Sequence, residues 1–253
     1  LGGRGPLGLR EMERYCRLVI DAVEPYVAAV KPQLACFERY GSDGYRAYQA
    51  VARHARDRDL IVIADAKRGD IGVSSEHYAE GLLAGSSPAD AVTVNGYLGA
   101  DGLTPFVKVA AREGAGLFVL VRTSNPGGDA LQRLRLEDGR SVADAVADMV
   151  GELGRAHVGS GGYSVVGATK PADAAALRER MPQQVFLVPG FGAQGGTAED
   201  VRACLKADGT GALITASRSV IYAFADPLDK GWQDAVARAA RDLRDQIAGL
   251  MRR

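Results

Sequence analysis

Apolar and polar positions follow two alternating patterns along this chain. Segments with an apolar residue every three or four positions are typical of amphipathic helices, and they separate short continuous apolar runs, which are typical of buried parallel strands. The helical pattern covers residues 10–25, 43–58, 74–85, 102–114, 141–156, 171–181, 197–207 and about 230 to the end. The apolar runs cover residues 27–31, 60–66, 91–95, 117–122, 163–167, 185–189 and 211–216.

Strands that alternate with helices predict a parallel sheet with helices outside it. A chain of 253 residues has the usual size of one (β/α)8 barrel. We therefore predict an α/β fold, a (β/α)8 TIM barrel, with residues 1–253 as a single domain. Only seven strands are predicted, and the printed sequence begins with a loop and a helix. Either the sheet is open, or the barrel's first strand is missing from the printed residues.

The composition is that of an ordinary globular protein, with 47% hydrophobic and 25% charged residues. Thirty-one basic residues balance thirty-one acidic ones, which argues against a general attraction to nucleic acid or to an anionic membrane. No apolar run is long enough to span a bilayer, and the first ten residues lack the apolar core of a signal peptide. Cys16, Cys36 and Cys204 show neither disulfide nor zinc-ligand spacing, so we expect reduced, mostly buried thiols in a cytoplasmic protein.

The most informative stretch is residues 61–71, where an apolar strand continues directly into charged residues. Because strand side chains alternate between faces, Asp65 and Lys67 share one side, and Asp70 falls in the loop beyond Arg68 and Gly69. This order predicts a lysine between two carboxylates at the C-terminal end of a strand, where α/β barrels place their chemistry. A solvated charged turn is the commoner alternative. The segment predicts a site but does not name a reaction.

A glycine-rich loop follows the strand at 185–189, and Gly190, Gly192 and Gly195 formally match G-x-G-x-x-G. A dinucleotide site is rejected, because the next strand ends in Thr215-Ala-Ser-Arg218 rather than in an acidic residue. The glycines still allow backbone N–H groups to approach an anion. Thr197 with Asp200 is typical of a capping box, at a helix N-terminus that favours phosphate. An ordinary tight turn is equally compatible with this loop alone.

Arg218 lies in the Ser217-Arg218-Ser219 segment directly after the last predicted strand. Loops after the seventh and eighth strands of barrels commonly form a phosphate site, and arginine can bind phosphate through two hydrogen bonds. An isolated arginine at a strand end is usually a surface residue. Beside the glycine-rich loop, a phosphate clamp is the better interpretation.

Two further strand ends carry polar residues. Lys31 ends its strand on the same side of the sheet as Asp65, although a lysine there could simply extend to solvent. Arg122-Thr-Ser124-Asn-Pro126 offers small hydrogen-bonding groups that suit a polar ring, although Ser and Asn before Pro also favour ordinary turns. His54, His77 and His157 lack metal-ligand spacing, and we expect surface or helix-packing roles for them.

Five segments in combination resemble the signature of orotidine 5′-phosphate decarboxylases, most closely the longer bacterial branch of that family. They are Val30-Lys31-Pro-Gln, Asp65-Ala-Lys67-Arg-Gly-Asp70-Ile-Gly, Arg122-Thr-Ser124-Asn-Pro, Val188-Pro-Gly-Phe-Gly-Ala-Gln194-Gly-Gly and Ala216-Ser-Arg218-Ser. They occur in the expected order, and the resemblance extends over residues 10–250.

The resemblance implies a homodimeric barrel that converts orotidine 5′-monophosphate (OMP) to UMP and CO2 in de novo pyrimidine biosynthesis, with neither a metal nor an organic cofactor. In such a protein Lys31, Asp65 and Lys67 form an alternating charge network, and Lys67 stabilises and protonates the C6 carbanion. Asp70 and Ser74 reach the partner's site.

The resemblance also implies how the rest of the substrate is bound. Ser124 bonds the pyrimidine and Ser74 a ribose hydroxyl, while Gln194 and Arg218 hold the phosphate. Pro189 and Gly195 complete the substrate-binding set. The family's first strand ends in an Asp-Pro pair whose aspartate bonds the ribose. The printed sequence has no such strand. We expect this strand to precede the printed residues, and a protein without it would lack both the ribose contact and barrel closure.

Two other functions remain open at this point. Magnesium-dependent sugar-phosphate decarboxylases and aldolases of the same superfamily also have an Asp-x-Lys strand, but the position of Asp70 and the Gln194 loop argue against them. A non-catalytic nucleotide-binding relative is motivated only by the missing strand, and it predicts binding of UMP analogues without turnover.

Overall fold

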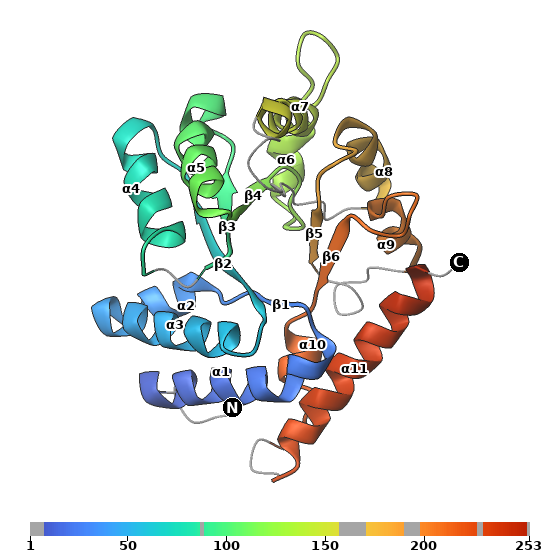
Figure 1. The fold of residues 1–253 in the computed structure, drawn as a ribbon. Coiled ribbons are helices and arrows are strands. Elements are labelled where there is room, and N and C mark those ends of the chain that lie inside the picture. The colour runs from blue at the N-terminus through green and yellow to red at the C-terminus, as the bar shows by residue number, and fades with distance from the viewer. Residues whose placement is uncertain (1–7, 87–88, 157–170, 190–197, 227–229, 252–253) are drawn as a thin grey trace.

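The computed structural model describes residues 8–86, 89–156, 171–189, 198–226 and 230–251. Its strands gather at the centre, and its helices surround them (Figure 1). The strands are β1 (Ala29–Val30), β2 (Ile61–Arg68), β3 (Ala91–Asn95), β4 (Gly116–Leu120), β5 (Phe186–Pro189) and β6 (Ala212–Thr215). The longer helices are α1 (Leu9–Val23), α3 (Gly41–Arg56), α4 (Gly72–Leu83), α5 (Gly99–Glu113), α7 (Val142–Ala156), α8 (Pro171–Arg180) and α11 (Trp232–Met251).

The described strands are parallel and pair in the order β1-β2-β3-β4 and, separately, β5-β6. Both groups contribute to one interior, because Ile63 and Phe118 of the first group pack in the same buried cluster as Leu187 of the second. Ala29, Ala91 and Leu213 join that cluster, so each described strand supplies one residue to it. The predicted barrel of parallel strands inside helices is therefore confirmed, while the strand predicted at 163–167 lies outside the described residues.

Alternate residues of the strands face the helices instead. Along β2, Val62 and Ala64 are fully buried in the large cluster between strands and helices, and Ile63 between them points into the barrel. This period of two explains why buried parallel strands are apolar on both faces. It also fixes the direction of the residues that follow, because Asp65 continues the inward series begun by Ile63.

The two ends of the described chain pack together. Val19 and Val23 of α1 share a buried cluster with Val236 and Ala240 of α11. These helices lie along the same side of the barrel (Figure 1). Among the residues that the structure describes, no helix is both long enough and apolar enough to cross a membrane.

Several short elements were not predicted from the sequence. They are the helices α2 (Leu34–Glu38), α6 (Gly128–Gln132) and α10 (Arg218–Ile221), and the 3-10 turn η1 (Glu24–Tyr26), whereas α9 (Ala198–Cys204) is a shorter form of the helix predicted at 197–207. Four or five residues contain too few turns for a helical period to show in the sequence. The strand predicted at 27–31 is reduced to two residues, whereas β2 continues to Arg68, two residues beyond its predicted end.

Candidate active site

Asp65 lies between two lysines at the inner, C-terminal end of β2. Lys31 Nζ donates to Asp65 Oδ2 at 2.6 Å, and Lys67 Nζ donates to Oδ1 of the same carboxylate. The Asp65 side chain is only 4% exposed, against 20% for Lys31 and 53% for Lys67. The predicted proximity of Lys31 to Asp65 is therefore present, with one buried carboxylate serving two cations.

The charge of Asp65 is maintained by these lysines. Burial by itself raises the pKa of a carboxyl group, because it penalises the charged form. Here the attraction of Lys31 and the hydrogen bonds from Lys31 and Lys67 outweigh burial, and the pKa of Asp65 is held below its ordinary value. Asp65 is thus an anion at neutral pH, facing the barrel interior.

The backbone at Lys67 departs from regular strand geometry. Its φ is +49°, in the left-handed region that lysine rarely adopts, and the register of β2 against β3 shifts between Ala64 and Arg68. The buried Thr93 of β3 accepts a hydrogen bond from the Lys67 N–H at 2.9 Å and donates one to Asp65 Oδ1 at 3.2 Å. Such an irregularity re-aims a side chain at the end of a strand.

Asp70 does not complete the expected arrangement within one chain. Its Oδ1 accepts a hydrogen bond from the Ile71 N–H at 2.9 Å, and no ion pair joins it to Lys67 among the described residues. The sequence predicted a lysine between two carboxylates. Within this chain the structure has a carboxylate between two lysines, and the backbone already turns at Lys67, before it reaches Asp70.

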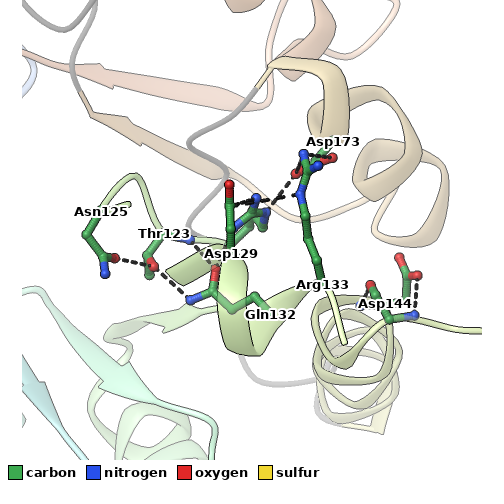
Figure 2. Close-up of polar contacts among 9 residues, drawn as sticks. Thr123, Asn125, Asp129, Gln132, Arg133, Asp144 and Asp173 are labelled. Carbon is green, nitrogen blue, oxygen red and sulfur yellow. Dashed lines mark hydrogen bonds and ion pairs between the residues drawn. The ribbon is translucent and has the colours of Figure 1, made fainter. Parts of the chain in front are cut away.

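The end of β4 carries a polar turn. Ser124 is exposed at its tip, between Thr123 and Asn125, whose side chains are hydrogen bonded to each other (Figure 2). Arg122, which precedes them, is 1% exposed and makes ion pairs with Asp129 and Asp173. The sequence had suggested only that this segment could bind a polar ring.

The predicted phosphate-binding residues are only partly described. Pro189 ends β5 and is half-buried, and Arg218 begins α10 and is exposed, directly after β6. Gln194 and Gly195, like the rest of the glycine-rich loop, lie outside the described residues. Ser74 is exposed on the first turn of α4, close in sequence to Asp70.

Sequence reasoning missed Thr93. The signal was a single hydroxyl in the otherwise apolar run Ala-Val-Thr-Val at inward parity with Ala91, which contributes to the barrel interior. His54 has the packing role expected of it, since its Nε2 lies 2.8 Å from Asp21 Oδ1. In the described part of the chain no three His, Cys, Asp or Glu side chains are grouped as a metal site would need.

Comparisons with known proteins extend over most of the chain. The sequence model of the family described as orotidine 5′-phosphate decarboxylase / HUMPS matches residues 7–231. An orotidine 5′-phosphate decarboxylase of Rhodopirellula baltica is 44% identical over 252 residues, 93% of this chain and 83% of that protein. One of Deinococcus radiodurans is 44% identical over 238 residues, 92% and 84% of the two chains. The structure of Leishmania donovani OMP decarboxylase matches with a TM-score of 0.83 and 33% identity, over 98% of this chain and 90% of that one.

Proposed function

We propose that the Lys31–Asp65–Lys67 network carries out the reaction of this chain, which belongs to the orotidine 5′-phosphate decarboxylase / HUMPS family. The chain is a carboxy-lyase that converts OMP to UMP in pyrimidine biosynthesis. The observation that carries the proposal is a buried carboxylate held between two lysines at the inner mouth of the barrel. One of those lysines is half-exposed, and so it is accessible to a substrate.

Lys67 is the proposed proton donor. When the bond from C6 of the pyrimidine to its carboxyl group breaks, CO2 leaves and the electron pair remains on C6. The Lys67 ammonium stabilises that charge and then transfers one proton to C6, which gives UMP and a neutral amine that solvent reprotonates. The strained backbone at Lys67 and the hydrogen bond that its Nζ donates to Asp65 hold the ammonium group in place before the substrate arrives.

Asp65 and Lys31 determine the electrostatic potential around the reacting groups. The anionic Asp65 lies next to the place proposed for the substrate carboxylate, and the repulsion between them is relieved as neutral CO2 forms. Lys31 fixes Asp65 from the other side and keeps the carboxylate charged. Because these groups are ordered before binding, little reorganisation is needed during the reaction.

The remaining residues are proposed to hold the parts of OMP that do not react. Ser124 bonds the pyrimidine and Ser74 a ribose hydroxyl. Arg218 binds the phosphate together with Gln194, Gly195 and Pro189. Binding energy from a phosphate far from C6 can be used to order the reacting groups.

We further propose a homodimer in which Asp70 and Ser74 reach the partner's site. Support comes from Ile71 (57% exposed) and Tyr97 (71%) in the loops after β2 and β3, and from Val73 (66%) on the first turn of α4. The loop after β2 lies against α5, the helix that follows β3, since a Cβ at Gly102 would lie 2.9 Å from the Asp70 carbonyl oxygen. Large apolar side chains gathered at one end of a barrel are typical of an interface, and they adjoin both residues proposed to cross it. The three thiols are free, which supports a cytoplasmic location, but the expectation that they are mostly buried was wrong, since only Cys204 is buried.

The direct test is the loss of OMP absorbance in the presence of excess EDTA, with the Lys67→Ala variant beside wild-type protein. We expect rapid loss with wild type, and a rate lower by more than about 10²-fold for Lys67→Ala, as removal of a proton donor implies. Circular dichroism checks that the variant is folded. A near-normal kcat in Lys67→Ala would contradict its role. Activity lost in EDTA and restored by magnesium would favour the metal-dependent members of the superfamily instead.

A further inference from the structure

Arg122 is a buried cation whose partners come from separate elements. Its Nε donates to Asp173 Oδ2 of α8 at 2.7 Å, its Nη1 donates to Gln132 Oε1 of α6 at 2.9 Å, and its Nη2 pairs with Asp129 of α6. A guanidinium that is 1% exposed is tolerated only when it is paired in this way. Arg122 therefore ties the end of β4 to α6 and α8.

The contacts of Arg122 continue into the turn after β4. Gln132 Oε1 also accepts the Thr123 N–H at 2.9 Å, and Gln132 Nε2 donates to Thr123 Oγ1 at 2.7 Å (Figure 2). Thr123 Oγ1 in turn donates to Asn125 Oδ1 at 2.6 Å. Both neighbours of Ser124 are thus held by side-chain hydrogen bonds that lead back to the buried guanidinium.

Gly128 shows how closely these groups are packed. A Cβ at this position would lie 2.8 Å from Thr123 Oγ1 and 3.3 Å from both Asn125 Oδ1 and Gln132 Nε2. The Gly128 N–H also donates to the Asn125 carbonyl oxygen at 3.0 Å, which closes the turn. The turn therefore has little freedom to move relative to α6.

We propose that Arg122, Gln132 and Thr123, with Asp129 and Asp173, form a latch that positions Ser124 for the pyrimidine ring. The latch residues are positioning residues, since they act through Ser124. This inference rests on the proposed function of Ser124. The latch should affect binding of the base alone, because Arg218, the residue proposed to bind the phosphate, follows β6 and not β4. Loosening the latch weakens binding of the base and leaves binding of the phosphate unchanged.

Thr123→Val and Thr123→Ser form a matched pair for the test. Valine keeps the shape of threonine but removes the hydroxyl, whereas serine retains the hydroxyl and both of its hydrogen bonds. We expect Thr123→Val to weaken UMP binding and to raise the KM for OMP, each by about five- to tenfold. Binding of ribose 5-phosphate, which lacks the base, stays within about twofold of wild type. Thr123→Ser behaves as wild type toward both ligands.

A second pair of variants acts on the latch from the other side. Gly128→Ala places a methyl group against the same hydrogen bonds, and it should reproduce the selective loss of UMP affinity. Arg122→Met should do so more strongly, with a lowered midpoint of thermal unfolding, because it removes the buried cation shared by Asp129 and Asp173 and leaves them only the exposed Arg133.

Two results would overturn the latch. One is an unchanged affinity of Thr123→Val for UMP while wild-type protein decarboxylates OMP. The other is an equal loss of UMP and ribose 5-phosphate binding, which would mean a general structural role. Failure of the proposed role of Ser124 looks different, since Ser124→Ala would then bind UMP as tightly as wild type, and the latch proposal would fall with it.

Discussion

Thr93 Oγ1 accepts a hydrogen bond from the backbone N–H of Lys67 at 2.9 Å, and it does so where the Lys67 backbone is in the left-handed region. That conformation costs a non-glycine residue about 1–2 kcal/mol, so the surrounding structure must hold it. The same hydroxyl donates to Asp65 Oδ1. One buried side chain on β3 therefore positions both the proposed proton donor and its carboxylate partner.

Replacing Thr93 with valine should lower kcat while the fold is retained. The variant loses two hydrogen bonds, leaves the Lys67 N–H without this acceptor, and frees the lysine backbone to relax. At about 1–1.5 kcal/mol per bond, kcat should fall by roughly tenfold or more, with a smaller change in KM. Steady-state OMP turnover measures both, and Thr93→Ser is the control that keeps the hydroxyl. A valine variant with the wild-type kcat would show that Lys67 needs no such support.

The relation between Lys31 and Asp65 could be predicted from the sequence. For Thr93 the sequence indicates an inward hydroxyl but not its hydrogen bonds to Lys67 and Asp65. Parity along parallel strands is enough to place two strand-end side chains on one inner face. The register shift between Ala64 and Arg68 cannot be recognised in the sequence pattern of β2, because it arises from pairing between β2 and β3. Within one chain the carboxylate that pairs with Lys67 is Asp65, and the expected approach of Asp70 from the partner subunit stays a prediction.

Arg122 illustrates a second limit. Its ion pair with Asp173 joins residues 51 positions apart, on a strand and on a helix that the sequence predicted separately. Nothing in the pattern of a single sequence links them. Short helices such as α6 were missed as well, and α6 carries both Asp129 and Gln132, which bind the same guanidinium.

The lowered pKa of Asp65 predicts how the stability of the protein depends on pH. Because the folded pKa lies below the ordinary value of 3.8, the unfolded chain binds this proton more readily. The stabilisation is therefore complete above about pH 5 and is lost as the pH falls through the folded pKa. Denaturant unfolding of wild type and Asp65→Asn should differ by a constant free energy from about pH 5 to 8, and by less below about pH 4. A difference that stays constant to about pH 2 would contradict the assignment.

Arg178 is expected to stabilise the fold at a place away from the proposed active site. Its guanidinium lies 3.6 Å from the centroid of the Phe186 ring. It donates hydrogen bonds of 2.7–2.9 Å to the carbonyl oxygens of Met181, Gln184, Cys204 and Gly211. Arg178→Met should cost about 3 kcal/mol, a fall of roughly 10 °C in the midpoint of thermal unfolding.

Arg112→Met is the matched control for Arg178→Met. Arg112 is half-exposed and pairs with Glu80 and Glu113 at the surface, where such pairs often contribute nothing measurable. Its unfolding midpoint should stay at the wild-type value. Equal midpoints for the two variants would mean that the four carbonyl contacts of Arg178 do not stabilise the fold.

Arg218→Ala should mainly weaken the binding of phosphorylated ligands. The residue follows β6 directly and is exposed, so its removal disturbs little packing. A charged hydrogen bond contributes about 1.5–3 kcal/mol, which predicts a KM for OMP raised by at least about tenfold. Affinity for ribose 5-phosphate should fall by a similar factor, in contrast to the Thr123→Val variant. An unchanged KM would remove Arg218 from the phosphate site.

A shared active site predicts that two inactive variants restore each other. If Asp70 acts in the partner's site, a heterodimer of Lys67→Ala and Asp70→Asn chains has one site with both defects and one with neither. Co-expression with two different affinity tags, followed by purification on both, isolates this heterodimer. We expect about half of the wild-type activity per dimer, although each homodimer is inactive, because one of the two sites is intact.

If Asp70 acted within its own chain, each site of the heterodimer would carry one defect and no activity would return. An active Asp70→Asn homodimer would instead show that this carboxylate is dispensable. The three results separate a site shared between subunits, a site built from one chain, and a charge that the reaction does not need.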